Sequence, residues 1–231
     1  MPTVLITGAN RGIGLEFVRQ YAEAGWQVHA CSRHMDAAAL NRLADLYGQN
    51  IRLHQLDVSD RNQIDQLAKQ LSDTAIDVLI NNAGIYPGGN KETFGTIDYS
   101  AWVNAFEINT MAPLKMAEAL VENVTKSHEK KIVNITSKMG SIDDNTSGGY
   151  YLYRSSKTAL NMVVKSLSLD LAPRGITTIV LHPGWVQTDM GGSNAPTPPD
   201  RSVAGMRRVI AGLSQNDSGR FYDFNGQEIL W

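Results

Sequence analysis

Residues 7–14 read Thr7-Gly8-Ala9-Asn10-Arg11-Gly12-Ile13-Gly14, and this glycine-rich turn decides the fold. It follows a short apolar run over 3–7 and opens a helix-like pattern. Glycines permit a tight turn and let the backbone approach a pyrophosphate, while the next helix offers its N-terminal N–H groups and positive dipole end. We therefore expect a phosphate-binding loop here; a glycine-rich turn without a ligand is the alternative.

Outward from this turn, short apolar runs alternate with longer amphipathic segments. The strand-like runs cover residues 3–7, 27–32, 51–56, 77–81, 131–136 and 177–182. One helical pattern begins near Arg11, and another starts at Ser59 with Asp60 as an N-cap signal. The other helical patterns cover 36–47, 100–124 and 150–172. This alternation predicts an α/β fold with a doubly wound, mostly parallel sheet and helices on both faces.

Length, charge and cysteine content exclude several classes of protein. The 231 residues carry a net charge of −2, which argues against a broad basic surface for nucleic acid. Cys31 is the only cysteine, so no intrachain disulfide forms, and the five histidines lack metal-site spacing. No apolar run reaches the ~18 residues of a membrane span, and the N-terminus lacks the basic region of a signal peptide. We expect a cytoplasmic, single-domain protein over 1–231 that binds neither membrane nor metal.

Three motifs in order along the chain resemble a known family. The spacing Gly8-x-x-x-Gly12-x-Gly14 is followed by Asn82-Ala83-Gly84 and then by Tyr153-x-x-x-Lys157. Together these motifs resemble the classical short-chain dehydrogenases/reductases, over nearly the whole chain. The stretches 148–157 and 181–190 resemble, more narrowly, the Sniffer and C-factor-like carbonyl reductases. The resemblance implies a single-domain Rossmann fold that binds a dinucleotide.

The residues after the second strand indicate which dinucleotide. NAD-binding proteins usually place a carboxylate there for the ribose 2′-OH, whereas this chain has Ser32 and Arg33. Arg33 can pair bidentately with a 2′-phosphate, and the resemblance puts Arg11 near the same ribose. We therefore expect NADP(H), with a solvated surface charge as the alternative for each arginine. The resemblance implies further cofactor contacts from Gly8, Asn10, Gly12, Ile13, Gly14, Asp57, Val58, Asn82, Ala83 and Gly84. Asp57 could instead only cap the next turn.

Tyr153 and Lys157 are the candidate catalytic pair. They are four residues apart on a predicted helix and so share a face. The resemblance implies that the Tyr153 hydroxyl exchanges a proton with the substrate oxygen and that Lys157 also holds the nicotinamide ribose. A nearby ammonium lowers the pKa of a phenol, so we expect Lys157 to lower the pKa of Tyr153. Ser137, at the end of the fifth strand, is the expected substrate-positioning hydroxyl; Thr136 beside it is the competing assignment.

Asn109 is a polar residue in an apolar helical stripe and therefore needs a partner. Pro113, four residues later, has no N–H and cannot donate to the Asn109 carbonyl. The resemblance implies that this carbonyl holds a water in a proton relay with Lys157. A simple proline kink is the alternative.

The segment after the sixth strand completes the expected site. The resemblance implies that Pro183 and Gly184 border the nicotinamide, and that the Val186 backbone and the Thr188 hydroxyl hold its carboxamide. The proline- and glycine-rich stretch 191–200 predicts an irregular loop, and we expect a substrate lid near 188–204 with Gly191-Gly192 as its hinge.

These residues favour NADPH-dependent reduction of a ketone or aldehyde, or the reverse oxidation of an alcohol. The expected catalytic set is Asn109, Ser137, Tyr153 and Lys157. A signalling or sensing protein that binds the dinucleotide without turnover is the alternative function. The expected partner is a small carbonyl or alcohol substrate. A homodimer or homotetramer is compatible with the family resemblance, and so is a monomer.

Overall fold

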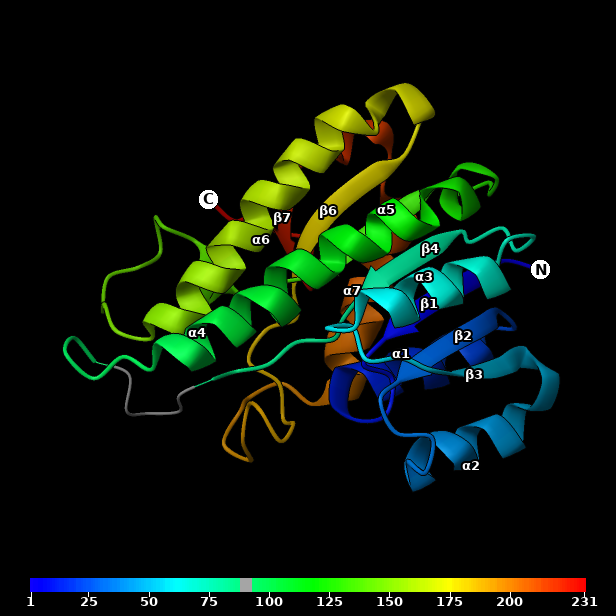
Figure 1. Ribbon diagram of the computed structural model, residues 1–231, viewed down its shortest axis with the longest axis horizontal. Coiled ribbons are helices and arrows are strands. Elements are labelled where there is room, and N and C mark those ends of the chain that lie inside the picture. The colour runs from blue at the N-terminus through cyan, green and yellow to red at the C-terminus, as the bar shows by residue number, and fades with distance from the viewer. Residues whose placement is uncertain (88–92) are drawn as a thin grey trace.

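The computed structural model describes residues 1–87 and 93–231, and its centre is a seven-stranded parallel sheet (Figure 1). The strands lie in the order β3-β2-β1-β4-β5-β6-β7. Their bounds are β1 Thr3–Thr7, β2 Gln27–Ser32, β3 Ile51–Gln55, β4 Val78–Asn81, β5 Lys131–Ile135, β6 Thr177–His182 and β7 Phe221–Asp223. Neighbouring strands are all parallel, so the predicted doubly wound Rossmann fold is confirmed.

Helices cover both faces of this sheet (Figure 1). The α-helices are α1 Gly12–Glu23, α2 Ala38–Tyr47, α3 Arg61–Gln70, α4 Tyr99–Phe106, α5 Ala112–Thr125, α6 Tyr151–Asp170 and α7 Pro199–Gly212. The short helical segments are η1 Gly48–Asn50, η3 Glu107–Met111, η4 Lys138–Gly140, η5 Ala172–Arg174 and η6 Gln215–Asp217. α1, α2 and α7 pack on one face, while α3, α5 and α6 pack on the other. None of the helices described is long and apolar enough to cross a bilayer.

The alternation of side chains along β1 divides the core into two layers. Val4 and Ile6 point to the α1 and α7 side, whereas Leu5 points to the α3 and α5 side. All five residues of β1 are buried. A parallel strand covered by helices on both faces reads as a continuous apolar run, which is why the sequence located this strand without error.

The C-terminal part of the chain differs from the prediction. β7 was not predicted, because three residues that include an aspartate carry little strand signal. The expected lid near 188–204 is too long, because α7 begins at Pro199, where the proline supplies a favourable first helical position.

The third helix, α3, begins later than predicted. It is capped by Asp60, whose carboxylate accepts N–H bonds from Asn62 and Gln63, and Ser59 lies outside it.

The predicted helix over 100–124 is interrupted by a π-helical turn. α4 continues into η3, a π-helix over Glu107–Met111, and then into α5. The Ala112 N–H donates to the Glu107 carbonyl, five residues back. Pro113 cannot make the ordinary bond to Asn109, so a register change next to it has a physical cause. The irregularity therefore lies at Asn109, as its spacing from Pro113 indicated.

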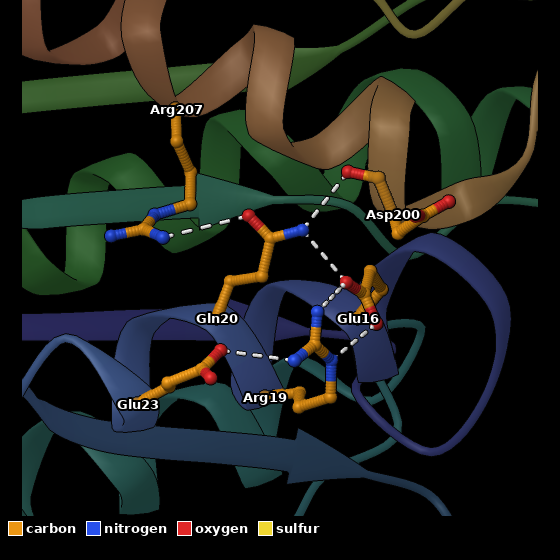
Figure 2. Close-up of polar contacts among 6 residues, drawn as sticks. All are labelled: Glu16, Arg19, Gln20, Glu23, Asp200 and Arg207. Carbon is orange, nitrogen blue, oxygen red and sulfur yellow. Dashed lines mark hydrogen bonds and ion pairs between the residues drawn. The ribbon is translucent and has the colours of Figure 1, made fainter.

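α7 is attached to α1 through polar side chains in the interface (Figure 2). The Gln20 amide donates to the Glu16 carboxylate at 2.7 Å and to the Asp200 carbonyl at 3.0 Å. The Arg207 guanidinium lies 4.7 Å from the centre of the Tyr21 ring, where a cation and a ring attract each other. Because Asp200 is in the first turn of α7, these contacts hold the base of the loop that follows β6.

Candidate active site

A cavity of about 430 Å³ opens at the carboxyl ends of the strands, where ligands bind in doubly wound sheets. Of the predicted site residues, those that line it are Gly8, Asn10, Arg11, Gly12, Ile13, Gly14, Ser32, Arg33, Asp57, Val58, Asn82, Ala83, Gly84, Tyr153, Lys157, Pro183 and Thr188. The predicted residues outside its lining are Asn109, Ser137, Gly184 and Val186. The structure thus brings most of the predicted set to one cavity.

The glycine-rich turn is closely packed against the segment after β4. Gly8 has a φ of +66°, and a Cβ there would lie 2.9 Å from the Ala83 Cα. A Cβ on Gly14 would overlap the Gly8 carbonyl oxygen. The Asn82 amide donates to the Thr7 and Gly8 carbonyls at 2.9 and 3.2 Å, so its side chain braces the turn. Asn82 therefore orders the glycine-rich turn with its Nδ2 and lines the cavity as well.

The end of β2 presents cationic and neutral groups to the cavity. Ser32, Arg33 and His34 line it, and none of these three is acidic. The Ser32 hydroxyl donates to the His34 carbonyl at 2.6 Å, which orders this turn. A 2′-phosphate at this position would meet the Arg33 guanidinium without a competing carboxylate from the same turn.

Asp57 has a local partner as well as a place in the cavity wall. Burial raises the pKa of Asp57, but bonds from the Ser59 hydroxyl and N–H, together with the nearby Arg33 charge, outweigh it and leave the pKa below its usual value. Asp57 therefore caps the turn before α3, which is the alternative role that the sequence left open. Asp57 and Val58 still line the cavity.

Tyr153 lies between Ser137 and the aromatic ring of Tyr86. The Tyr86 ring centre lies 4.8 Å from that of Tyr153, and the Ser137 side chain is near enough to the Tyr153 hydroxyl to favour its ionised form. Burial raises the pKa of Tyr153 to about 12, and the Ser137 side chain opposes that shift. The expected lowering by Lys157 is wrong for this structure, because burial of the phenol prevails. Thr136 is engaged elsewhere, since its hydroxyl donates to Asn161, so Ser137 is the hydroxyl that reaches Tyr153.

The Lys157 ammonium lies beneath the Tyr153 ring. Its Nζ is 5.9 Å from the ring centre and donates to the Ile135 carbonyl at 3.0 Å. Burial lowers the pKa of Lys157 to about 8, so the group is still mostly protonated at neutral pH. It also lies close to Gly84, where a Cβ would approach Nζ within 3.5 Å. The Asn-Ala-Gly segment and the lysine are therefore neighbours in space.

Asn109 is fully buried behind the cavity wall with its side chain satisfied. Its Oδ1 accepts from the Ile85 N–H at 2.9 Å, and its Nδ2 donates to the Ile85 carbonyl and to the Ser156 hydroxyl. The expected partner of this polar side chain thus exists, and it joins the π-helix η3 both to the segment after β4 and to α6. The Asn109 carbonyl cannot accept from Pro113, as predicted.

The loop after β6 is braced by its own hydrogen bonds. The Gln187 N–H donates to the Thr197 carbonyl, and the Thr197 N–H donates to the Trp185 carbonyl. The Gly191 N–H donates to the Thr188 hydroxyl. A Cβ on Gly191 would overlap the Val186 carbonyl oxygen, so the loop needs a glycine at this close approach. Gly184 packs on Phe224, which explains why it lies behind the cavity lining.

One ion pair crosses the cavity mouth. Arg11 Nη1 lies 2.8 Å from Asp189 Oδ2, and the two side chains are 68% and 76% exposed. Both residues line the cavity, so the glycine-rich turn is joined to the loop after β6. Asp189 was not predicted as a site residue, because residues 178 positions apart carry no sequence signal of contact.

Sequence reasoning missed several further lining residues. They are His34, Leu56, Ile85, Ile108, Ile135 and Asp189, whereas Thr136, considered beside Ser137, also lines the cavity. Leu56 and Ile135 lie at the carboxyl ends of predicted strands, so the rule that ligands bind there could have found them. Ile108 lies in the π-helix, whose presence no local pattern shows.

Comparison with known proteins identifies the family. The model of the short chain dehydrogenase family matches residues 2–198. The C-signal protein of Myxococcus xanthus is 48% identical over 156 residues, which are 68% of this chain and 93% of that protein. The carbonyl reductase Sniffer of D. melanogaster is 34% identical with a TM-score of 0.92, and the match covers 100% of both chains. The NADPH-bound carbonyl reductase from chicken fatty liver is 34% identical with a TM-score of 0.90, over 100% of this chain and 99% of that one. This chain therefore belongs to the short-chain dehydrogenase/reductase family of oxidoreductases.

Proposed function

We propose that this oxidoreductase uses NADPH to reduce a ketone or aldehyde, or NADP⁺ to oxidise the corresponding alcohol. The observation that carries the proposal is the grouping of Tyr153 and Lys157 at the wall of the cavity, with Lys157 Nζ 5.9 Å from the Tyr153 ring centre and the Ser137 side chain beside the Tyr153 hydroxyl. Two whole-chain structural neighbours are carbonyl reductases, and one of them has NADPH bound. A complete Ser137, Tyr153 and Lys157 set favours turnover over dinucleotide sensing alone.

The cavity residues fit NADP(H). The glycine-rich turn leaves no room for Cβ atoms at Gly8 and Gly14, so a pyrophosphate can approach its backbone and the N-terminus of α1. Arg33, after β2, would pair with the 2′-phosphate, and Arg11 would add a second cation. Asp57, Val58 and the Asn-Ala-Gly segment would flank the adenine and ribose. Lys157, Pro183 and Thr188 would border the nicotinamide end.

Tyr153 would act as the proton donor in reduction. When bound, the nicotinamide supplies the hydride that reaches the carbonyl carbon. A pKa of about 12 keeps the Tyr153 phenol protonated at neutral pH, which is the form that can donate to the developing alkoxide. Ser137, beside the Tyr153 hydroxyl, would hold the same substrate oxygen and stabilise its growing negative charge.

Lys157 and Asn109 would support the tyrosine after proton transfer. The Lys157 ammonium faces the ring that becomes a phenolate, and an opposite charge at that position stabilises the phenolate. The Asn109 carbonyl, which Pro113 cannot reach, would hold a water that returns the proton through Lys157. The π-turn at η3 supports this role, because such turns occur frequently at functional sites.

The loop after β6 would cover the substrate. Residues 185–198, between β6 and α7, carry Trp185 and Met190 on the exposed side of the site. The rest of the predicted lid, from 199 to 204, lies in α7 and would serve as its fixed base. Tyr86, packed on Tyr153, would form the opposite wall.

The test is the loss of nicotinamide absorbance with NADPH, then NADH, against a reactive dicarbonyl. We expect turnover with NADPH and a collapse of kcat in Tyr153→Phe, which removes only the hydroxyl. Tight NADPH binding with no turnover by the unmodified protein would contradict the proposal and favour the sensing alternative.

A further inference from the structure

Ser137 lies at the start of a short turn that α6 holds in place. The turn is η4, and the Ser137 hydroxyl accepts the Met139 N–H at 3.2 Å, so the side chain is ordered by its own turn. The position of the whole turn then decides where Ser137 lies relative to Tyr153. That position depends on contacts between η4 and the helix that carries Tyr153.

Asn161 bonds to the chain on both sides of Ser137. Its Oδ1 accepts from the Thr136 hydroxyl at 2.8 Å, and its Nδ2 donates to the Gly140 carbonyl at 3.1 Å. Asn161 is 2% exposed, so neither bond is replaced by solvent. The amide needs both its acceptor and its donor here, and neither an aspartate nor a leucine could make both bonds.

Two further contacts hold η4 against α6. The Thr158 hydroxyl also donates to the Gly140 carbonyl, at 2.8 Å. A Cβ on Gly140 would lie 2.9 Å from the Lys157 backbone carbon, so the turn touches the helix backbone at the level of Lys157. Such direct contact leaves little freedom for the turn to shift while these bonds last.

Tyr153, Lys157 and Asn161 are spaced by four residues and form one buried face of α6. Tyr153 faces Ser137, Lys157 donates to the Ile135 carbonyl, and Asn161 bonds to Thr136 and Gly140. We propose that Asn161 is a positioning residue that sets Ser137 against the Tyr153 hydroxyl by holding Thr136 and Gly140 on α6. This inference rests on the proposed function.

The predicted consequence is specific to the chemical step. Asn161→Asp keeps an acceptor for Thr136 but sets a carboxylate oxygen against the Gly140 carbonyl, which displaces η4. Because small displacements of reacting groups can cost up to about 100-fold in rate, we expect kcat to fall roughly 10- to 100-fold. The KM for NADPH should change little, because Asn161 lies outside the lining of the cofactor cavity.

A pH profile distinguishes positioning from general damage. The Ser137 side chain lowers the pKa of Tyr153, so a displaced Ser137 raises it. Alcohol oxidation needs the ionised phenol, and its rate rises with pH as Tyr153 ionises. The midpoint of that rise should therefore move to higher pH in Asn161→Asp, whereas a merely structural defect would lower the rate equally at every pH.

The matched control is Asn123→Asp. Asn123, in α5, is also a buried asparagine, and its amide donates to the Leu71 and Thr74 carbonyls after α3, away from the cavity. The Asn123→Asp variant should lose thermal stability as Asn161→Asp does, yet keep its kcat and pH profile.

Thr136→Val is the second test variant, because it preserves the shape of the side chain and removes one bond to Asn161. It should lower kcat by about 2- to 10-fold, the effect of one hydrogen bond, even if Asn161→Asp fails to fold.

Three outcomes would overturn these claims. If the unmodified protein turns over and Tyr153→Phe does not, but the Asn161 and Thr136 variants keep kcat and the pH midpoint, only the role of Asn161 is refuted. A parallel loss of kcat and NADPH affinity that Asn123→Asp reproduces would refute it too. No turnover by the unmodified protein would refute the proposed function, and the role of Asn161 with it.

Discussion

Asp189→Asn tests whether Arg11 serves the cofactor. Asp189 binds the Arg11 guanidinium at 2.8 Å across the cavity mouth, so it competes with any phosphate for that cation. Both side chains are largely exposed, and exposed pairs are worth about 0.2–1 kcal/mol. Freeing Arg11 should therefore raise the affinity for NADPH by at most about fivefold, since about 1.4 kcal/mol corresponds to a tenfold change in a dissociation constant. NADH, which lacks the 2′-phosphate, should gain less.

The assay is a fluorescence titration of NADPH and NADH at low and high salt, with thermal unfolding in parallel. At about 1 M salt the Debye length is near 3 Å, so the gain should nearly vanish. The unfolding temperature should fall by no more than about 4 °C for a chain of this size. Glu122→Gln is the matched control, because Glu122 forms an exposed pair with Arg174 away from the cavity.

The double variant Arg11→Ala/Asp189→Asn separates two possible causes of tighter NADPH binding. If Arg11 mediates the effect, Asp189→Asn changes nothing once Arg11 is alanine; if Asp189 repels phosphate directly, the gain persists. An equal gain for NADPH and NADH, or weaker NADPH binding in Asp189→Asn, would refute the assignment of Arg11 to the 2′-phosphate.

Three further predictions concern other parts of the chain. Arg33→Ala should weaken NADPH by roughly 10- to 150-fold, the worth of a charge-assisted bond, and leave NADH nearly unchanged; equal losses in a binding titration would exclude a 2′-phosphate contact. Gly14→Ala places a Cβ against the Gly8 carbonyl and should cost about 1–3 kcal/mol in a denaturant melt together with NADPH binding, whereas Gly212→Ala, with open space around it, should cost nothing. The buried His29 ring nitrogen lies 2.8 Å from His54, and burial, then the charges of His54 and Arg52, lower the pKa of His29 to about 4. A folded-state pKa below the unfolded value of ~6.5 gives stability that is present above pH 6.5 and lost as pH falls toward 4, up to about 3 kcal/mol. Urea melts of the unmodified protein and of His29→Gln at several pH values in this window should show that the free energy of unfolding falls more steeply with decreasing pH in the unmodified protein. An identical pH dependence in the two proteins would show that the pair does not titrate there.

Much of the fold was predictable because its signals are local. Buried parallel strands read as continuous apolar runs, and the runs at 3–7, 27–32 and 177–182 coincide with β1, β2 and β6. The glycine-rich turn indicated the first βα crossover. β7 was not predictable, because three residues gain their strand geometry only by pairing with β6.

The candidate site was predictable where a motif follows a strand. The carboxyl ends of parallel strands meet at one edge, so residues after β1, β2, β4 and β6 had to converge there. The burial of the Tyr153 phenol was not predictable from these motifs. The pKa of Tyr153 was expected to be lowered by Lys157, but the packing around the phenol raises it to about 12.

The sequence by itself determined the alternation of strands and helices, the glycine turn, and the spacing that puts Tyr153 and Lys157 on one helical face. These depend on contacts within a few residues, and backbone sterics and helical periodicity decide them. Only the tertiary structure decided that Asp189 meets Arg11, that Asn161 holds both sides of Ser137, and that α7 replaces part of the expected lid. Each of these depends on which distant segments pack together, and close packing of a whole chain is not encoded in any short stretch of it.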